Sequence, residues 1–128
     1  MFKTLEQFCS KLPGAKFDLK WDSERTYCIA DKMFVVFCPD TKSSDDIKHV
    51  CFKVSPADFL ALTGRSGIAP APYLARYHWV LVGADNALTQ KELETLIKGS
   101  YDMVFSKLTK KKQQAILSTS SWPTYLSF

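Results

Sequence analysis

Hydrophobic and polar residues alternate along the chain with two periods, and each period predicts a different kind of element. A period near 3.6 residues predicts amphipathic helices at residues 2–12, 56–62 and 90–108. A period near two, or a short unbroken apolar run, predicts strands at residues 15–21, 26–30, 33–38, 47–54 and 78–82. The expected element order is therefore α-β-β-β-β-α-β-α.

Residues that cap helices or form turns separate these elements. Pro13-Gly14 ends the first helix. Ser55-Pro56 places a capping hydroxyl before a proline at the first helical position. Thr89-Gln90-Lys91-Glu92 matches a capping box in front of the strongest amphipathic stretch. Residues 39–46 and 67–76 contain turn residues and prolines, and are expected to be a polar loop and an ordered non-helical connection.

The order of the elements predicts an α+β fold. Consecutive strands joined by short turns favour antiparallel pairing, and each amphipathic helix needs a sheet face on which to bury its apolar stripe. We therefore expect a two-layer α/β sandwich with a mainly antiparallel sheet of about five strands and the helices on one face. Residues 1–112 form the expected domain. Residues 113–128 form an extension with Trp122, Tyr125 and Phe128, which is expected to pack on the same domain or on a partner.

Composition excludes several classes of function. The chain contains no apolar run of the about 20 residues that cross a bilayer, and its charged start lacks a signal-peptide core, so a cytoplasmic location is expected. Its four cysteines form no C-x-x-C pair, which argues against a metal site and favours reduced, structural thiols. The net charge of +4 permits an acidic partner without requiring one. Lys110-Lys111-Lys112 is interpreted as a helix C-terminal cluster.

A series of short segments carries a more specific signal. In chain order they are Leu12-Pro13-Gly14-Ala15, Trp21, Tyr27, Lys32-Met33-Phe34, Phe52-Lys53-Val54, Pro70-Ala71-Pro72-Tyr73-Leu74, Trp79-Val80 and residues 93–101. Each segment is common by itself, but their order and spacing together resemble the MmcQ/YjbR family of small bacterial proteins. The resemblance covers roughly residues 1–112.

This resemblance implies a frataxin-like, or double-wing, α+β fold and DNA binding. It transfers no catalytic residues, because the family has no agreed set. The chain departs from the family pattern at Asp31, where family members commonly have glycine. That aspartate adds a negative charge beside Lys32, a residue that we expect to contact phosphate.

Four residues are candidates for nucleic-acid binding, namely Lys32, Lys53, Arg76 and His78. Lys53 lies on the strand face opposite Val54, Arg76 and His78 flank Tyr77 at the entrance to the last strand, and Lys32 lies in a turn from which it could join them. Cations grouped on one face would neutralise phosphates. The competing interpretation is that they are ordinary solvated residues on the open face of the sheet.

Catalysis finds little support in the sequence. Only His49 and His78 could act as bases near neutral pH, and neither belongs to a nucleophile–base signature or lies near a glycine-rich phosphate loop. We therefore expect a non-enzymatic protein without cofactor or metal.

The leading hypothesis is weak, largely sequence-independent DNA binding through a basic sheet face. The alternative is a protein-interaction or chaperone-like adaptor module that uses the open sheet face and the aromatic tail. The expected assembly is a monomer or a weak homodimer.

Overall fold

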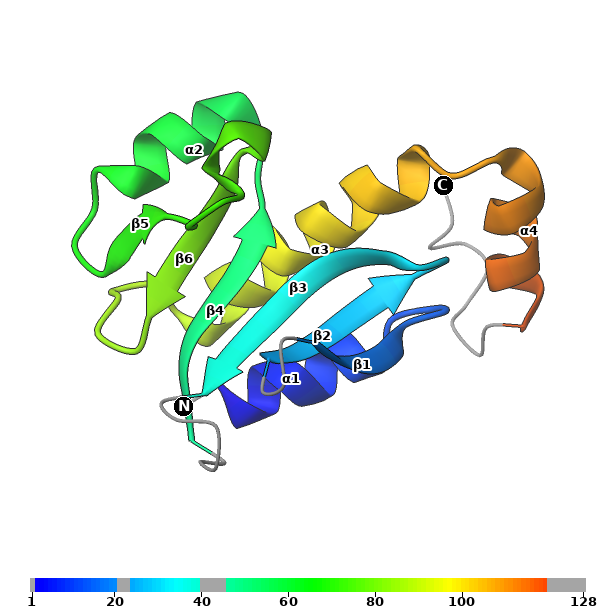
Figure 1. Cartoon of the computed structure of the whole chain (residues 1–128), viewed down its shortest axis with the longest axis horizontal. Coiled ribbons are helices and arrows are strands. Elements are labelled where there is room, and N and C mark those ends of the chain that lie inside the picture. Colours follow the sequence, from blue (N-terminus) through cyan, green and yellow to red (C-terminus); the bar gives the residue numbers. More distant parts are fainter. Residues whose placement is uncertain (1, 21–23, 40–45, 120–128) are drawn as a thin grey trace.

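A six-stranded antiparallel sheet runs through the computed structural model, which describes residues 2–20, 24–39 and 46–119 (Figure 1). The spatial order is β1-β2-β3-β4-β6-β5, so the first four strands follow chain order and β6 lies between β4 and β5. The strands are β1 (Lys16–Lys20), β2 (Glu24–Ile29), β3 (Lys32–Pro39), β4 (Ile47–Lys53), β5 (Ile68–Pro70) and β6 (Trp79–Gly83). The predicted α+β class with an antiparallel sheet is confirmed.

Helices supply the second layer. They are the α-helices α1 (Lys3–Ser10), α2 (Pro56–Thr63), α3 (Gln90–Ser106) and α4 (Lys110–Thr119). A short 3₁₀ helix, η1 (Ala75–Tyr77), lies in the connection between β5 and β6. The long helix α3 packs on β3 and β4 and also contacts α1 (Figure 1). Its start is the predicted capping box, in which the Thr89 hydroxyl accepts from the Glu92 amide and the Glu92 carboxylate accepts from the Thr89 amide.

The main core lies between the sheet and the helices. Residues of α1, α2 and α3 pack there against alternate residues of the strands, and Phe34, Val35 and Phe52 are fully buried. The pairing of β2 with β3 shifts by one residue between Tyr27 and Cys28, which leaves Phe34 as an extra residue on β3. This bulge explains how the neighbours Phe34 and Val35 both reach the same core.

A smaller apolar cluster covers part of the opposite face of the sheet. It contains Val36, Cys51, Ala71 and Trp79, all buried. Trp79 pairs with Lys53 rather than with Phe52, so Trp79 and Phe52 lie on opposite faces of the sheet. The connection from Ala71 to His78 packs on this face, and the predicted open, basic sheet face is therefore absent over β3, β4 and β6. The alternation on β4 gave the two faces correctly, but it could not show that the proline-rich connection folds back over one of them.

Among the described residues, the sheet has one strand more than the predicted five, and there is one α-helix more than predicted, besides the short 3₁₀ helix. Ile68–Pro70 pairs with β6 at the edge of the sheet, where a proline that ends a strand is tolerated. Helix α4 begins at Lys110, so the Lys110-Lys111-Lys112 cluster lies at a helix start and not, as predicted, at a helix end. The Thr109 hydroxyl accepts from the Lys112 amide there. A threonine followed by ten residues without proline or glycine was the signal for this helix.

Helix α4 crosses the boundary expected after residue 112. Its Ile116 and Leu117 pack against the main core, and Ile116 lies beside Gly14. The side-chain amide of Gln113 donates to the carbonyls of Phe105 and Leu108 at the end of α3. The tail aromatics Trp122, Tyr125 and Phe128 lie outside the described residues, as do Trp21 and residues 40–45 of the expected loop.

Candidate anion-binding site

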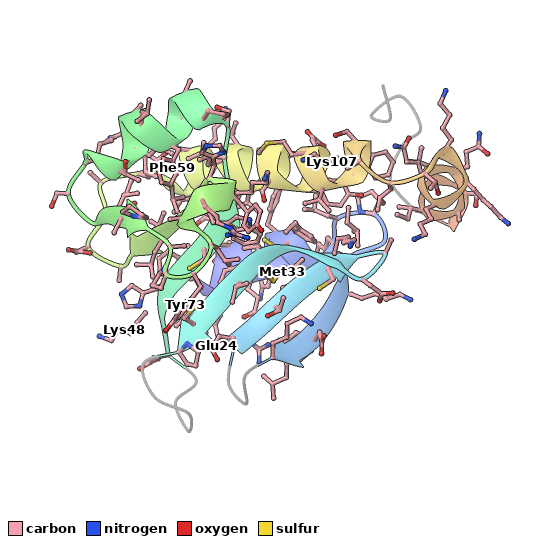
Figure 2. All side chains as sticks on the ribbon, turned by 45° about the horizontal axis from the view of Figure 1, so that its top comes forward. Glu24, Met33, Lys48, Phe59, Tyr73 and Lys107 are labelled. Carbon is pink, nitrogen blue, oxygen red and sulfur yellow. The ribbon has the colours of Figure 1, made fainter. Side chains whose placement is uncertain are left out.

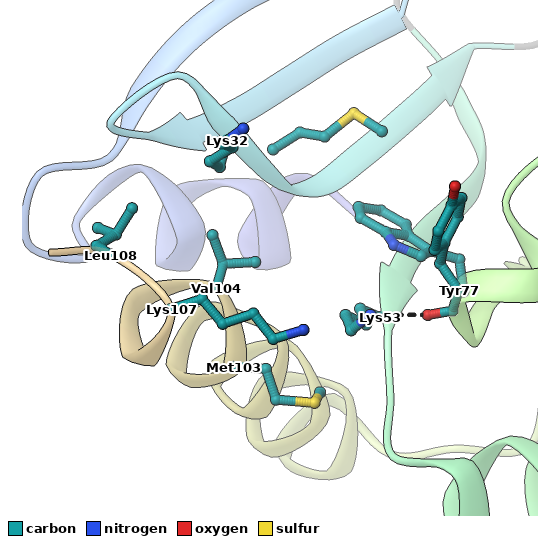
Figure 3. A pocket seen from close by; sticks show the side chains of 9 residues that line it. Lys32, Lys53, Tyr77, Met103, Val104, Lys107 and Leu108 are labelled. Atoms are coloured by element: carbon teal, nitrogen blue, oxygen red, sulfur yellow. Dashed lines mark hydrogen bonds between the residues drawn. The ribbon is translucent and has the colours of Figure 1, made fainter.

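A cavity of about 300 Å³ lies where β3 begins, β4 ends and α3 ends (Figure 3). Three lysines, two aromatic residues and four apolar side chains line it: Lys32, Met33, Lys53, Tyr77, Trp79, Met103, Val104, Lys107 and Leu108. Among the described residues, the lining contains no aspartate or glutamate. The cavity therefore combines positive charge with apolar walls.

Lys32 is positioned by the tight turn between β2 and β3. Ile29 pairs with Lys32, and the two residues between them, Ala30 and Asp31, both have positive φ values, 47° and 66°. Two central residues with positive φ define a type I′ turn, whose twist matches that of the flanking strands. The turn starts β3 at Lys32 and exposes its side chain at the rim of the cavity.

Lys53 is positioned by a local opening between β3 and β4. The ladder ends at the pair Val35–Phe52, and the next two residues, Phe34 and Lys53, do not bond to each other. The buried hydroxyl of Ser100 on α3 bridges them instead, accepting from the Lys53 amide at 3.1 Å and donating to the Phe34 carbonyl at 2.7 Å. The pairing of the two strands therefore ends next to the cavity, which Lys32 and Met33 of β3 and Lys53 of β4 line.

The ammonium group of Lys53 is held inside the cavity. Its Nζ donates to the carbonyl oxygen of Tyr77 at 2.9 Å (Figure 3). Burial lowers the pKa of Lys53 below that of an ordinary lysine, and the nearby charge of Lys107 lowers it further. Within the part of the chain that the structure describes, none of the three lining lysines forms an ion pair. No acidic side chain of the described residues is therefore paired with these three charges, although Asp31 directly precedes Lys32 in the chain.

Lys107 brings the third charge from the end of α3. It caps that helix, and its side chain extends toward Lys53 across the mouth of the cavity (Figure 3). Val104 and Leu108, on either side of it, pack against the main core and hold the end of the helix in place. The start of α4 follows directly, with three more exposed lysines at 110–112.

An aromatic wall closes the side of the cavity nearest β6. Trp79 is buried, whereas the Tyr77 ring is about half exposed. The Arg76 guanidinium lies 4.8 Å from the centre of the Tyr77 ring, and its Nη2 donates to the Tyr77 hydroxyl at 2.6 Å. Arg76 is thus adjacent to the cavity without lining it.

The four residues predicted from the sequence divide into three groups. Lys32 and Lys53 line the same cavity, and Arg76 stacks on one of its walls. His78 has a positive φ of 65° and packs its ring against Phe59 of α2, and it is not among the residues that line the cavity. Lys107 was missed. Its spacing of four residues from Met103 marks a helix face, but nothing in the sequence places the end of α3 beside the ends of β3 and β4.

The histidines and cysteines do not form a second site. The four cysteines are free, and Cys51 contacts Cys38 across the strand pair rather than His49. The Cys51 thiol donates a hydrogen bond to Cys38, and this bond, together with burial, raises the pKa of Cys51 and disfavours its thiolate. The same bond lowers the pKa of Cys38, which burial opposes. Among the described residues, no group of three or more histidine, cysteine or acidic side chains is arranged to hold a metal ion. The same residues include no helix with the length and apolar composition needed to cross a bilayer.

The described fold and cavity define a small α+β protein with a cationic site at the end of its sheet. The model of the YjbR family matches residues 10–103, and the chain belongs to this family. The resemblance to MmcQ/YjbR that the sequence suggested is thus confirmed. No curated protein matches the chain.

Solved structures share the fold. A Deinococcus radiodurans protein, DR2400, with a DUF419 domain, is similar with a TM-score of 0.74 and 24% identity, over 88% of this chain and 84% of that chain. A crystal structure of a Pseudomonas syringae protein has a TM-score of 0.64 and 21% identity, over 81% of this chain and 99% of that one. A solution structure from Pseudomonas syringae has a TM-score of 0.61 and 23% identity, over 81% and 92%. At these identities the likeness shows the fold alone.

Proposed function

We propose that the protein is a non-enzymatic, cytoplasmic domain that binds DNA weakly and with little sequence preference. The contact surface is the end of the molecule where β3 begins, α3 ends and α4 begins. The observation that supports this most is the convergence of Lys32, Lys53 and Lys107 on one cavity without an acidic side chain among its described lining. The exposed lysines at 110–112 extend the positive surface along α4.

The arrangement favours contacts to phosphate over reading of bases. The lysines are point charges on flexible stems, and no bidentate guanidinium or amide faces the cavity from its described lining. Phosphate contacts fix position and supply affinity but carry no sequence information. Affinity should therefore depend on salt far more than on base sequence.

A salt series tests this proposal directly. Lys53→Gln combined with Lys107→Gln removes two charges and keeps a donor near the Tyr77 carbonyl. Since each neutralised phosphate contributes about −0.9 to the slope of log K against log salt, the slope should become shallower by about two units. Fluorescence anisotropy with a short duplex over a range of salt concentrations measures it.

The chain offers a matched control in Lys48→Gln combined with Lys91→Gln. These lysines lie on the same two elements, β4 and α3, but at the opposite ends, and Figure 2 shows Lys48 far from Lys107. The control should leave the slope unchanged. Equal slopes for both double variants, or no binding at low salt, would rule out the proposed surface.

A substitution of Asp31 should strengthen DNA binding, whereas the lysine substitutions should weaken it. Asp31→Asn removes the negative charge next to Lys32, and asparagine tolerates the positive φ of 66° at this turn position. DNA should bind more tightly to this variant than to the parent at equal salt, by up to about threefold for one partly screened charge. An unchanged or weaker affinity in the same anisotropy assay would place Lys32 outside the contact surface.

A protein-interaction role is the second candidate, and one observation favours it. β1 is an edge strand with exposed Phe17 and Leu19, whose side chains are 49% and 54% accessible. An exposed apolar edge strand can pair with a strand of another chain. Dimer formation that Phe17→Lys abolishes, measured by sedimentation, would favour this role over DNA binding.

A further inference from the structure

The cavity is small enough and polar enough on one side to select a ligand more specific than a stretch of DNA backbone. Its volume of about 300 Å³ is at the lower end of the range for small-molecule sites. The ammonium groups of Lys32, Lys53 and Lys107 share the lining with the aromatic residues Tyr77 and Trp79, and Lys53 lies directly beside them, since its Nζ bonds to the Tyr77 carbonyl. A ligand that fills it therefore has an anionic head and a flat or apolar body.

The three charges come from three separate elements, β3, β4 and the end of α3, which hold them near each other in spite of their mutual repulsion. Lys53 cannot turn away freely, because its Nζ bonds to the Tyr77 carbonyl and its amide bonds to Ser100. Lys107 faces it, and the repulsion between the two contributes to the lowered pKa of Lys53. An anion between them would remove this repulsion, so the cavity favours binding of negative charge.

The number of charges distinguishes among anions. A phosphate monoester carries a charge of about −1.5 to −2 near pH 7 and presents three acceptor oxygens. A phosphodiester in the backbone of DNA carries a single charge and is flanked by a sugar on both sides. Three lysines around one cavity match the monoester better.

The aromatic wall suggests what is attached to that phosphate. The Tyr77 ring is half exposed, and Arg76 stacks on it, which fixes its orientation. Bases stack on such rings with about 1–3 kcal/mol per base. Apolar contacts from Met33 and Leu108 complete the lining.

We propose that the cavity binds a phosphate monoester attached to a nucleobase-containing body, either a free nucleoside 5′-monophosphate or the 5′-phosphate end of a DNA strand. The second form rests on the proposed DNA binding, whereas the first does not. The phosphate is placed among Lys32, Lys53 and Lys107, and the base against Tyr77.

Two pairs of ligands test this inference and separate the two sources. The first pair is adenosine 5′-monophosphate and adenosine, measured by calorimetry. The second is one single-stranded ten-nucleotide DNA with a 5′-phosphate or a 5′-hydroxyl, measured by anisotropy. In each pair the phosphorylated ligand should bind at least about tenfold more tightly, since it alone makes charge-assisted bonds to the lysines. Lys53→Gln should remove that preference, and Lys48→Gln should preserve it.

A second variant places a competing carboxylate in the cavity without altering any lysine. Met103 lines the cavity on α3, four residues before Lys107. Met103→Glu should abolish the preference for the phosphorylated ligand and keep the protein folded, because a glutamate four residues before a lysine suits a helix. Met103→Gln is the neutral control and should bind as the parent does.

The outcomes distinguish this inference from the proposed function. Equal binding of both ligands in each pair, with salt-dependent DNA binding intact, would overturn the inference and leave the proposed function standing. Binding of the nucleoside monophosphate without binding of either DNA strand would support the inference and overturn the proposed function. Inorganic phosphate binding as tightly as the nucleoside monophosphate would overturn the assignment of a base to the aromatic wall.

Discussion

Phe52→Ala is expected to lower the free energy of unfolding by about 3–5 kcal/mol, because it removes a large side chain from the centre of the main core. Phe52 is fully buried on β4 and lies between Val35 and Val80 of the two neighbouring strands. Both neighbours are also fully buried, and the sheet is covered at this point by α3. The surroundings of Phe52 therefore cannot collapse easily into the space that the mutation leaves, and the cost should fall in the upper half of this range.

Phe17→Ala is the matched control, because it makes the same substitution on the edge strand. The Phe17 side chain is 49% exposed and contacts Tyr27 edge to face at 5.6 Å. Its removal should cost about 1 kcal/mol, mainly through loss of that ring contact. Urea unfolding followed by circular dichroism gives both values from the shift in midpoint at constant slope. A cost for Phe52→Ala no larger than that for Phe17→Ala would contradict the assignment of the core.

The sequence predicted the elements whose signals are local. The capping box at Thr89 and the alternation of residues 47–54 gave α3 and β4 to within one or two residues. Elements with weaker local signals were missed. β5 has only three residues and ends in Pro70, and it exists because β6 offers it a partner. Strand pairing of this kind depends on the position of another segment and leaves no pattern within the short strand itself.

The candidate site could be predicted only in part for the same reason. Lys53 was identified as a cation on one strand face and Lys32 as a cation in a turn beside it, yet that face was expected to be open. Trp79 is buried and also lines the cavity. Lys107 lies in the site because α3 is long enough, and packs in the right direction, to end beside the cavity. Both properties depend on tertiary packing, which the local sequence does not show. The cavity itself depends on the opening of the ladder at Phe34 and Lys53, where no residue type differs from that of an ordinary strand.

The hydroxyl of Ser100 bridges the two strands at that opening, and its removal is the second substitution for which we expect a large loss of stability. Ser100→Ala removes the group that bonds both the Lys53 amide and the Phe34 carbonyl. Ser100 is fully buried, so water cannot easily replace the hydroxyl. Each buried polar group left without a partner costs about 1–3 kcal/mol, and two such groups should together lower the free energy of unfolding by about 2–4 kcal/mol.

Ser106→Ala is the control for this prediction, since it makes the same change on the same helix at an exposed hydroxyl that bonds only within α3, to the Met103 carbonyl. It should change stability by less than about 0.5 kcal/mol. Hydrogen exchange adds a local measurement, because the Lys53 amide should exchange faster in Ser100→Ala than in Ser106→Ala. If the Lys53 amide instead stays protected and stability is retained, the two strands have closed directly onto each other in the variant. The serine would then be dispensable for the fold, and the cavity, now narrowed, should lose its affinity for anions.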